Sequence, residues 1–336
     1  MLILGIESSC DDAAAAVLET TQRGVATVLA STVANQDDIH RIYGGIVPEL
    51  ASRNHVVTIQ PVIERALASA GRSLAEIDGI AVTRGPGLVG SLLVGLMYAK
   101  GLAQATGLPW VGVNHIEGHL LAPLLEHPIR MPYLALVVSG GHTALFVVED
   151  FGRYRKLGAT RDDAAGEAFD KVAKLMGLGY PGGKIIDELS RAGNHKCVRI
   201  PRARVKGAPL DFSFSGVKTA VASLLRSEAG AGLSQPDLAA SFQEAVVEML
   251  VRPTLAAARE HDLETIALTG GVAANSRLRD SLAAAAANEG RRLVAPSFKY
   301  CTDNAAMIAL AGSYRLLDGA RDPLDLDAEA NLTLPQ

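Results

Sequence analysis

The feature that most constrains the fold is a strand–turn–strand unit that occurs twice in the chain. An apolar, strand-like run at residues 2–6 leads into a polar turn with acidic residues, and then into a second apolar run that ends at Leu18. The same order returns at 133–148, around the turn at 139–143. Two copies of one unit, one in each half of the chain, predict a duplicated α/β domain.

Strands and helices alternate after each of these units. Helical periodicity at 55–70 precedes a strand at 77–83, and a strand at 264–269 precedes a helix at 275–288. This alternation is typical of a mixed sheet that is covered by helices.

A chain of 336 residues is long enough for about two domains. The prolines of the segment 128–132 mark the expected hinge. We expect an N-terminal domain over 1–125, completed by the C-terminal segment 315–336. The C-terminal domain is expected over 126–314, with inserted helices and a basic loop at 191–211.

Net charge argues against a protein that coats nucleic acid. Lys and Arg total 32 against 36 Asp and Glu, which gives a net charge of -4, whereas such proteins are basic. Any contact with nucleic acid must therefore come from a local patch or from partners. The stretch 191–206 is such a patch, because it has no acidic residue and carries Arg191, Lys196, Arg199, Arg202, Arg204 and Lys206. The alternative is an ordinary basic surface loop.

Cysteine usage indicates a reducing compartment. Cys10, Cys197 and Cys301 are widely spaced and form no C-x-x-C pair, so neither a disulfide framework nor a cysteine-rich zinc site is expected. The apolar stretch 88–105 contains Lys100 and several glycines, which favours a packed helix over a membrane span. We expect a cytoplasmic protein that does not contact a membrane.

The segment from His115 to His119 is the sharpest local signal. Two imidazoles at i and i+4 lie on one face of a helix, within reach of one metal ion. Glu117 has the wrong offset for the base of a zinc peptidase of the H-E-x-x-H type. The alternative is a pair of polar residues that opens a helix. Asp303 is a candidate third ligand, and its alternative role is the N-cap of a helix at 303–317.

Three turns in the second half are rich in glycine: 139–143, 180–184 and 269–275. Their backbone N–H groups are unobstructed, as in cradles for phosphate or carboxylate groups. None matches a Walker A motif or a dinucleotide-binding fingerprint in its proper context. Asp170 and Asp187 flank the second turn, where their carboxylates are candidates for binding ribose hydroxyls or, alternatively, lie on a solvated helix face.

These motifs together resemble one family over nearly the whole chain. The segments that carry the resemblance are 5–11, 43–53, 85–88, 115–119, 139–143, 163–171, 211–216, 270–275 and 301–307. The family is that of the bacterial tRNA N6-adenosine threonylcarbamoyltransferases, formerly described as O-sialoglycoprotein endopeptidases. The resemblance implies an α/β, duplicated actin-like (ASKHA, RNase H-like) two-domain fold with a cleft between the halves.

The resemblance also implies a reaction and its cofactor. The threonylcarbamoyl group of threonylcarbamoyl-AMP passes to N6 of adenosine 37 in tRNAs that read ANN codons, which forms t6A and AMP. One divalent metal ion per subunit, usually Fe²⁺ with Zn²⁺ or Mg²⁺ as alternatives, is held by His115, His119 and Asp303. ATP, ADP or AMP can also occupy the cleft.

The resemblance assigns further residues to the substrate. The implied substrate-binding residues are Val138, Ser139, Gly140, Gly141, His142, Asp170, Gly183, Asp187 and Asn275. His142 and Asp11 are the candidates for proton transfer, and Arg199, Arg202 and Arg204 are the candidates for contact with tRNA. Two departures from the family pattern are Lys184 after the Gly182–Gly183 pair and the atypical C-terminal tail.

Partners follow from the same resemblance. The implied partners are the tRNA anticodon loop, a smaller paralogue without the metal site, and a P-loop ATPase. The helices at 55–70 and 88–105 are candidates for an interface with the paralogue or with a second copy of this chain, through Gly90, Val94, Gly95, Leu96 and Met97. The rival functions are a kinase or ATPase of the same superfamily, a metallopeptidase, and a scaffold subunit that only binds nucleotide.

Overall fold

The computed structural model describes residues 1–23 and 25–334. The chain divides into two compact units, of which the first combines Met1–Pro128 with Pro296–Gln336 and the second is Ile129–Ala295. These units are defined by packing alone. The predicted division into duplicated domains, 1–125 with 315–336 and 126–314, therefore stays a prediction.

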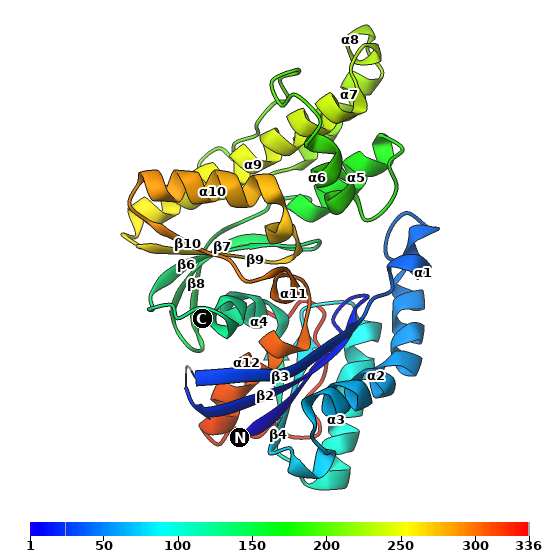
Figure 1. Cartoon of the computed structure of the whole chain (residues 1–336), viewed down its shortest axis with the longest axis vertical. Helices are drawn as coiled ribbons and strands as arrows, with labels where there is room; N and C mark the ends of the chain where they lie inside the picture. Colours follow the sequence, from blue (N-terminus) through cyan, green and yellow to red (C-terminus); the bar gives the residue numbers. More distant parts are fainter. Residues whose placement is uncertain (24, 335–336) are drawn as a thin grey trace. The chain divides into compact units, whose positions relative to one another are not determined.

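The first unit is built on a five-stranded mixed sheet in the order β3-β2-β1-β4-β5 (Figure 1). The strands are β1 (Leu2–Glu7), β2 (Ala13–Gln22), β3 (Val25–Ala34), β4 (Gly79–Gly85) and β5 (Trp110–Asn114). β2 is antiparallel to both β1 and β3, whereas β1, β4 and β5 run parallel.

The second unit repeats this sheet strand for strand. The strands are β6 (Tyr133–Val138), β7 (Thr143–Asp150), β8 (Arg153–Ala159), β9 (Thr265–Thr269) and β10 (Arg292–Val294), in the order β10-β9-β6-β7-β8. β7 is antiparallel to β6 and β8, and β6, β9 and β10 run parallel. The duplication predicted from the two hairpins is thereby confirmed.

Helices cover both sheets. Those of the first unit are α1 (Asp37–Arg41), α2 (Pro48–Ala70), α3 (Val89–Thr106), α4 (His115–Leu121), α11 (Phe298–Cys301) and α12 (Ala305–Leu317), with short 3-10 turns at Leu74–Glu76 and Ala122–Leu125. Those of the second unit are α5 (Ala165–Leu175), α6 (Gly182–Ser190), α7 (Ser215–Leu225), α8 (Glu228–Ala231), α9 (Gln235–Glu260) and α10 (Ser276–Asn288), with a 3-10 turn at Gly271–Ala274. Within the described residues, no helix combines the length and the apolar character that crossing a membrane requires.

The first sheet is buried on both faces by different helices. Ala15 and Val17 of β2 pack in one cluster with α2 and α3, while Ala14 and Ala16 pack in another with the start of α12. This alternation is the period of two that a strand imposes on its side chains. Figure 1 shows α12, from the red end of the chain, beside the blue strands β1 and β2.

Leu96 of α3 corrects one expectation for the helical interface. It is fully buried in the cluster that joins α3 to the sheet, and Gly95 lies against Ser8. Met97, by contrast, is 56 % exposed. The helical stripe that reaches the surface therefore runs through Met97, and Leu96 belongs to the core.

The close fit of α12 on the sheet gives a first prediction. A Cβ atom at Gly312 would lie 2.3 Å from Ala81 Cβ and 3.2 Å from Val111 Cγ2. Gly312→Ala should therefore lower the free energy of unfolding by about 1–3 kcal/mol, the usual effect of overpacking, in urea denaturation. The matched control is Gly101→Ala in α3, where a Cβ meets no atom within 4 Å, so helix propensity should make that variant equally or more stable. Equal stability of both variants would contradict the packing argument.

Candidate functional site

His115 and His119 lie on one face of α4, as their spacing predicts. α4 begins directly after β5, and Asn114 caps it by accepting hydrogen bonds from the N–H groups of Ile116 at 2.8 Å and Glu117 at 3.4 Å. The two imidazole rings are edge-to-face, with centroids 4.7 Å apart. Their side chains are buried, with 5 % and 0 % exposure.

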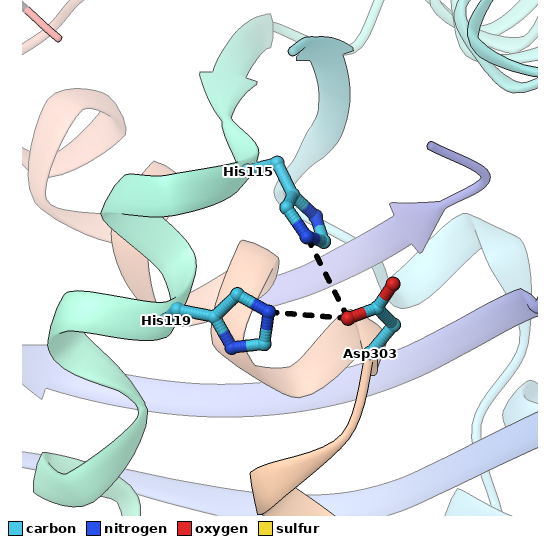
Figure 2. Close-up of side chains that lie close together, drawn as sticks. All are labelled: His115, His119 and Asp303. Carbon is cyan, nitrogen blue, oxygen red and sulfur yellow. Dashed lines mark hydrogen bonds and ion pairs between the residues drawn. The ribbon is translucent and has the colours of Figure 1, made fainter. Parts of the chain in front are cut away.

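Asp303 meets both histidines from the segment between α11 and α12 (Figure 2). Its Oδ1 lies 3.1 Å from His119 Nε2 and 3.5 Å from His115 Nε2. The N-cap of α12 is Asn304, whose side chain accepts a hydrogen bond from Met307 N at 3.0 Å. Because Asn304 supplies the cap, the alternative role of Asp303 is wrong, and its carboxylate is directed at the imidazoles.

Glu7 contacts the nitrogen of His115 that points away from Asp303. The sequence patterns did not predict this role for Glu7. It is the last residue of β1, it is fully buried, and its Oε2 lies 2.9 Å from His115 Nδ1 and accepts a hydrogen bond from Thr83 Oγ1 at 2.6 Å. Ser9 N donates to its other oxygen. The signal available in the sequence was a carboxylate at the end of an otherwise apolar strand, which demands buried partners.

The charges of Glu7 and Asp303 raise the pKa of His115, and the charge of His115 lowers the pKa of Glu7. Burial disfavours the imidazolium of His115, but the charges of Asp303 and Glu7 and the hydrogen bond from Glu7 outweigh it and raise its pKa to about 9. Burial likewise disfavours the carboxylate of Glu7, yet the charge of His115 and the hydrogen bonds from His115 and Thr83 lower its pKa. An acceptor carboxylate behind a ligand imidazole fixes the ring and makes it a stronger donor.

The donor set fits a divalent metal ion. One ligand atom from each of His115, His119 and Asp303 can be chosen so that all lie within 4.8 Å of one another. His115 turns one nitrogen to Glu7 and the other towards Asp303. The buried Nδ1 of His119 has no hydrogen-bond partner among the residues that the structure describes. Two imidazoles and one carboxylate are a donor set typical of sites that hold iron or zinc.

The implied substrate-binding residues gather in the second unit around the ends of β6 and β9. Val138 ends β6, and the following turn closes when Ser139 N donates to His142 O at 2.7 Å and His142 N to Ser139 Oγ at 3.1 Å. Gly166 of α5 donates to Ser139 O at 3.3 Å. Gly270, with φ of 96°, lies directly against Val138 O.

Hydrogen bonds connect the remaining members of this set. Asp170 Oδ1 accepts from Gly182 N at 2.8 Å, at the start of α6. Asp187 Oδ1 accepts from Ser276 N at 3.2 Å and from Ser276 Oγ at 2.8 Å, which joins α6 to α10. Asn275 caps α10 through Leu278 N at 2.9 Å and donates to Gln243 Oε1 at 2.7 Å. The turn at 180–184 is thus partly helical, because α6 already begins at Gly182.

Several glycines of these turns have no reason inside the fold to be glycine. A Cβ atom at Gly140, Gly141, Gly183 or Gly271 would meet no atom within 4 Å, and none of the four has a left-handed φ. Packing demands glycine at Gly166 and Gly270 instead, where a Cβ would lie 2.6 and 2.3 Å from backbone atoms. The open glycines leave backbone N–H groups accessible to an anionic ligand.

Asp11 and Asp12 form an acidic turn between β1 and β2 in the first unit. Burial is the main reason that the pKa of Asp11 is raised. Burial and the charges of Asp11, Asp303 and Asp37 raise the pKa of Asp12 to about 8, against a hydrogen bond of 3.0 Å from Asn35. The carboxyl group of Asp12 is therefore ready to keep or accept a proton near neutral pH.

The candidate tRNA-contacting arginines have different surroundings. Arg202 is bound through two nitrogens to Glu248, at 2.7 and 2.9 Å. Arg199 and Arg204 are exposed. Neither side chain has a hydrogen bond or ion pair with any described residue.

Comparison with known proteins decides the family. The sequence pattern of the family described as tRNA N6-adenosine threonylcarbamoyltransferase matches residues 27–310. The chain belongs to the tRNA N6-adenosine threonylcarbamoyltransferase family. Curated relatives with that name are 52 % identical over 338 residues in Syntrophotalea carbinolica and 55 % identical over 330 residues in Anaeromyxobacter dehalogenans. These alignments cover 100 % and 97 % of this chain, and 98 % of each relative.

Solved structures show that this member of the family has the actin-like fold. The component A of (R)-2-hydroxyglutaryl-CoA dehydratase from Acidaminococcus fermentans matches with a TM-score of 0.56 and 15 % identity, over 94 % of this chain and 99 % of that one. Full-length HypF matches with a TM-score of 0.63 and 13 % identity, over 95 % of this chain and 47 % of that one. At such identities the likeness concerns the fold alone.

The raised pKa of Asp12 makes a prediction about stability. Its pKa is about 8 in the folded chain, above the ordinary value of 3.8, so the folded state binds the proton more tightly and loses stability as pH rises through this window. Asp12→Asn should therefore stabilise the chelator-treated protein at pH 9 by on the order of 2–4 kcal/mol and change it little at pH 4. Urea denaturation at both pH values measures this.

The control for this prediction is Asp38→Asn, which removes the same charge from a side chain that is 90 % exposed. Its effect on stability should be small at both pH values. A gain at pH 9 that is the same for Asp12→Asn and Asp38→Asn would show that net charge, and not burial of Asp12, is responsible.

Proposed function

We propose that this chain transfers the threonylcarbamoyl group of threonylcarbamoyl-AMP to N6 of adenosine 37 in tRNAs that read ANN codons, which forms t6A and AMP. The observation that carries the proposal is the identity above 50 % with curated relatives of that name over nearly the full length of both chains. The buried His–His–Asp set and the open glycine turns supply the two kinds of site that the reaction needs.

His115, His119 and Asp303 would hold one divalent ion, and we propose Fe²⁺. A set of two imidazoles and one carboxylate is typical of non-haem iron and also suits zinc, whereas magnesium prefers oxygen ligands. When bound, the ion supplies a Lewis acid that polarises threonylcarbamoyl oxygens. Glu7 positions His115 for this task through their 2.9 Å contact.

The chain's own residues would bind the substrate and manage its charge. The N–H groups of the turn Ser139–Gly141 are suited to the carboxylate or the developing oxyanion of the threonylcarbamoyl group. Asp170, Gly183, Asp187 and Asn275 are proposed to contact the nucleotide part. The bond from N6 to the carbamoyl carbon forms as the bond to the AMP phosphate oxygen breaks, and His142 or Asp11 would take the N6 proton.

The acceptor would be the anticodon loop of tRNA. Bases in a single-stranded loop can be splayed out at low cost, which brings N6 of adenosine 37 within reach of a site on the protein. We propose Arg199 and Arg204 as contacts for the tRNA backbone, and the cytoplasm as the location in which the chain meets it.

Protein partners are proposed to dock on α2 and α3. Val56 and Val57 of α2 are 65 % and 66 % exposed, and on α3 Val89, Leu93 and Met97 recur every four residues with 52 %, 37 % and 56 % exposure. An exposed apolar stripe at helical spacing suits helix-to-helix docking. The proposed occupant is the smaller paralogue or a second copy of this chain, with a P-loop ATPase as a further member of the complex.

Removal of the metal ligands tests the metal site. His119→Ala should reduce the iron content of anaerobically loaded protein from about one ion per chain to background, because two ligands cannot hold the ion. Conversion of tRNA, followed by nucleoside analysis, should fall at least about a hundredfold, more than an outer-shell change typically causes.

The control for the metal site is His261→Ala, which removes an imidazole outside the cluster of Figure 2. Iron content and conversion should both stay at the level of the unmodified protein. Full conversion by the His119→Ala variant, freed of metal by a chelator, would remove the metal from the proposed reaction.

Charging the apolar stripe tests the docking surface. Met97→Glu should abolish the complex with the paralogue, or the homodimer, in size-exclusion chromatography, because a carboxylate would be buried without a partner. The stability of the single chain should change by less than about 0.5 kcal/mol. The control is Leu225→Glu, which charges a 40 % exposed leucine in the second unit. Complexes that survive Met97→Glu would place the partner elsewhere.

A further inference from the structure

A basic groove lies in the second unit between the loop 195–204 and α9. It has a volume of about 1190 Å³, and its lining includes six cationic side chains and two carboxylates. The carboxylates are those of Glu244 and Glu248. Each is already neutralised by an arginine, Glu244 by Arg277 at 2.6 Å and Glu248 by Arg202 at 2.7 Å.

The loop is hydrogen-bonded to α9 at three positions along the helix. Three contacts run in the same direction along both segments: Asn194 N donates to Asp237 Oδ1 at 2.7 Å, Val198 N to Ser241 Oγ at 3.3 Å, and Arg202 to both oxygens of Glu248 at 2.7 and 2.9 Å. Buried Ile200 lies between the last two, and its carbonyl accepts from Arg202 at 2.7 Å. The loop thus has a defined course beside the helix.

Arg202 contributes its hydrogen bonds to the attachment of the loop to α9. All of its contacts go to Glu248 and to the loop's own backbone at Ile200. A bidentate arginine–carboxylate pair is strong and geometrically specific, so an incoming phosphate would have to displace Glu248. Arg202 is therefore a positioning residue for the groove.

Arg204 and Arg252 are placed differently. Arg252 is one helical turn beyond Glu248 on α9, and Arg204 is two residues beyond Arg202 on the loop, so the course of both segments brings the two guanidinium groups into one stretch of the groove. Among the described residues, neither side chain has a hydrogen bond or an ion pair. Partial burial and the charge of Arg204 lower the pKa of Arg252, as expected for two facing cations.

We propose that Arg204 and Arg252 together bind a phosphate of the RNA backbone, and that Arg202 and Glu248 hold the loop so that the pair is preformed. This proposal rests on the proposed function, because a tRNA substrate supplies the polyanion. Two neighbouring guanidinium groups that form no ion pair with a described residue are matched to phosphate oxygens by their planar donor geometry. Exposed Arg199 and Lys196 on the same groove would extend the track along the backbone.

The test is the salt dependence of tRNA binding by the full chain, measured by fluorescence anisotropy. In the double variant Arg204→Gln with Arg252→Gln, the slope of log K against log salt should flatten by about 1–2, and affinity at low salt should fall at least about tenfold. The variant Arg204→Lys with Arg252→Lys keeps both charges and should keep most of the slope.

The matched control is Arg153→Gln with Arg155→Gln on β8, which removes two charges from side chains that are 68 % and 50 % exposed in the same unit. Its slope should be unchanged, and an equal loss in both double variants would overturn the proposal in favour of a net-charge effect. Circular dichroism confirms that each variant is folded.

The binding assay, combined with an assay of t6A formation, separates this proposal from the proposed function. His119→Ala should abolish t6A formation and leave the salt slope intact, whereas Arg204→Gln with Arg252→Gln should raise the KM for tRNA and leave kcat intact. A salt slope that the arginine variants do not move would reject the phosphate site even if t6A is formed. A slope that they flatten would support the site even if no t6A is formed.

Discussion

The candidate metal site depends on the hydrogen bonds that the buried carboxylate of Glu7 makes. It ends β1 without any exposure to solvent, and its partners come from three segments: the following turn through Ser9, the neighbouring strand β4 through Thr83, and α4 through His115. A charge removed from water is tolerated only when such partners surround it. The requirement to satisfy Glu7 therefore fixes the start of α4 against the sheet, and with it the direction of the first imidazole.

The two units carry different functional groups at their equivalent first hairpins, β1–β2 and β6–β7. Glu7 ends β1 and the turn that follows carries the acidic pair Asp11 and Asp12, whereas the turn between β6 and β7 carries serine and two open glycines. One hairpin thus supplies carboxylates and the other supplies backbone N–H groups. The same topology thus presents a candidate metal site beside one hairpin and open backbone N–H groups in the turn of the other.

Sequence patterns predicted the strongly buried helices and strands but not the more exposed strands β3 and β8. The paired hairpins were predicted because their buried strands are continuous apolar runs, and the shared helix face of His115 and His119 followed from their i, i+4 spacing. β3 and β8 were not predicted, because few of their side chains are buried: Ala30 alone in β3, and Tyr154 and Gly158 in β8. Leu96 was misassigned because a helix packed on two sides is apolar all round, so its sequence alone does not tell core from surface.

Side-chain partners were harder to foresee than elements. The sequence left Asp303 with two candidate roles, metal ligand or N-cap of α12, and in the structure Asn304 forms that cap. Glu7 gave no local signal beyond its place at the end of β1. Arg202 and Arg204 are two residues apart in one basic run, yet one is neutralised and the other is not, because Glu248 lies opposite only the first. The distinction depends on residues about 46 positions away in the chain, which no local pattern contains.

The position of α12 has a consequence for how the chain is made. α12 covers one face of the sheet that begins at the N-terminus, and its backbone approaches β1 so closely that Gly5 has no room for a side chain against Ala305 O. During synthesis the first strands therefore leave the ribosome with one face uncovered, and the helix that closes it arrives last. The second unit is continuous in sequence and needs no later segment. On the ribosome, the middle of this polypeptide can reach its native core before its beginning does.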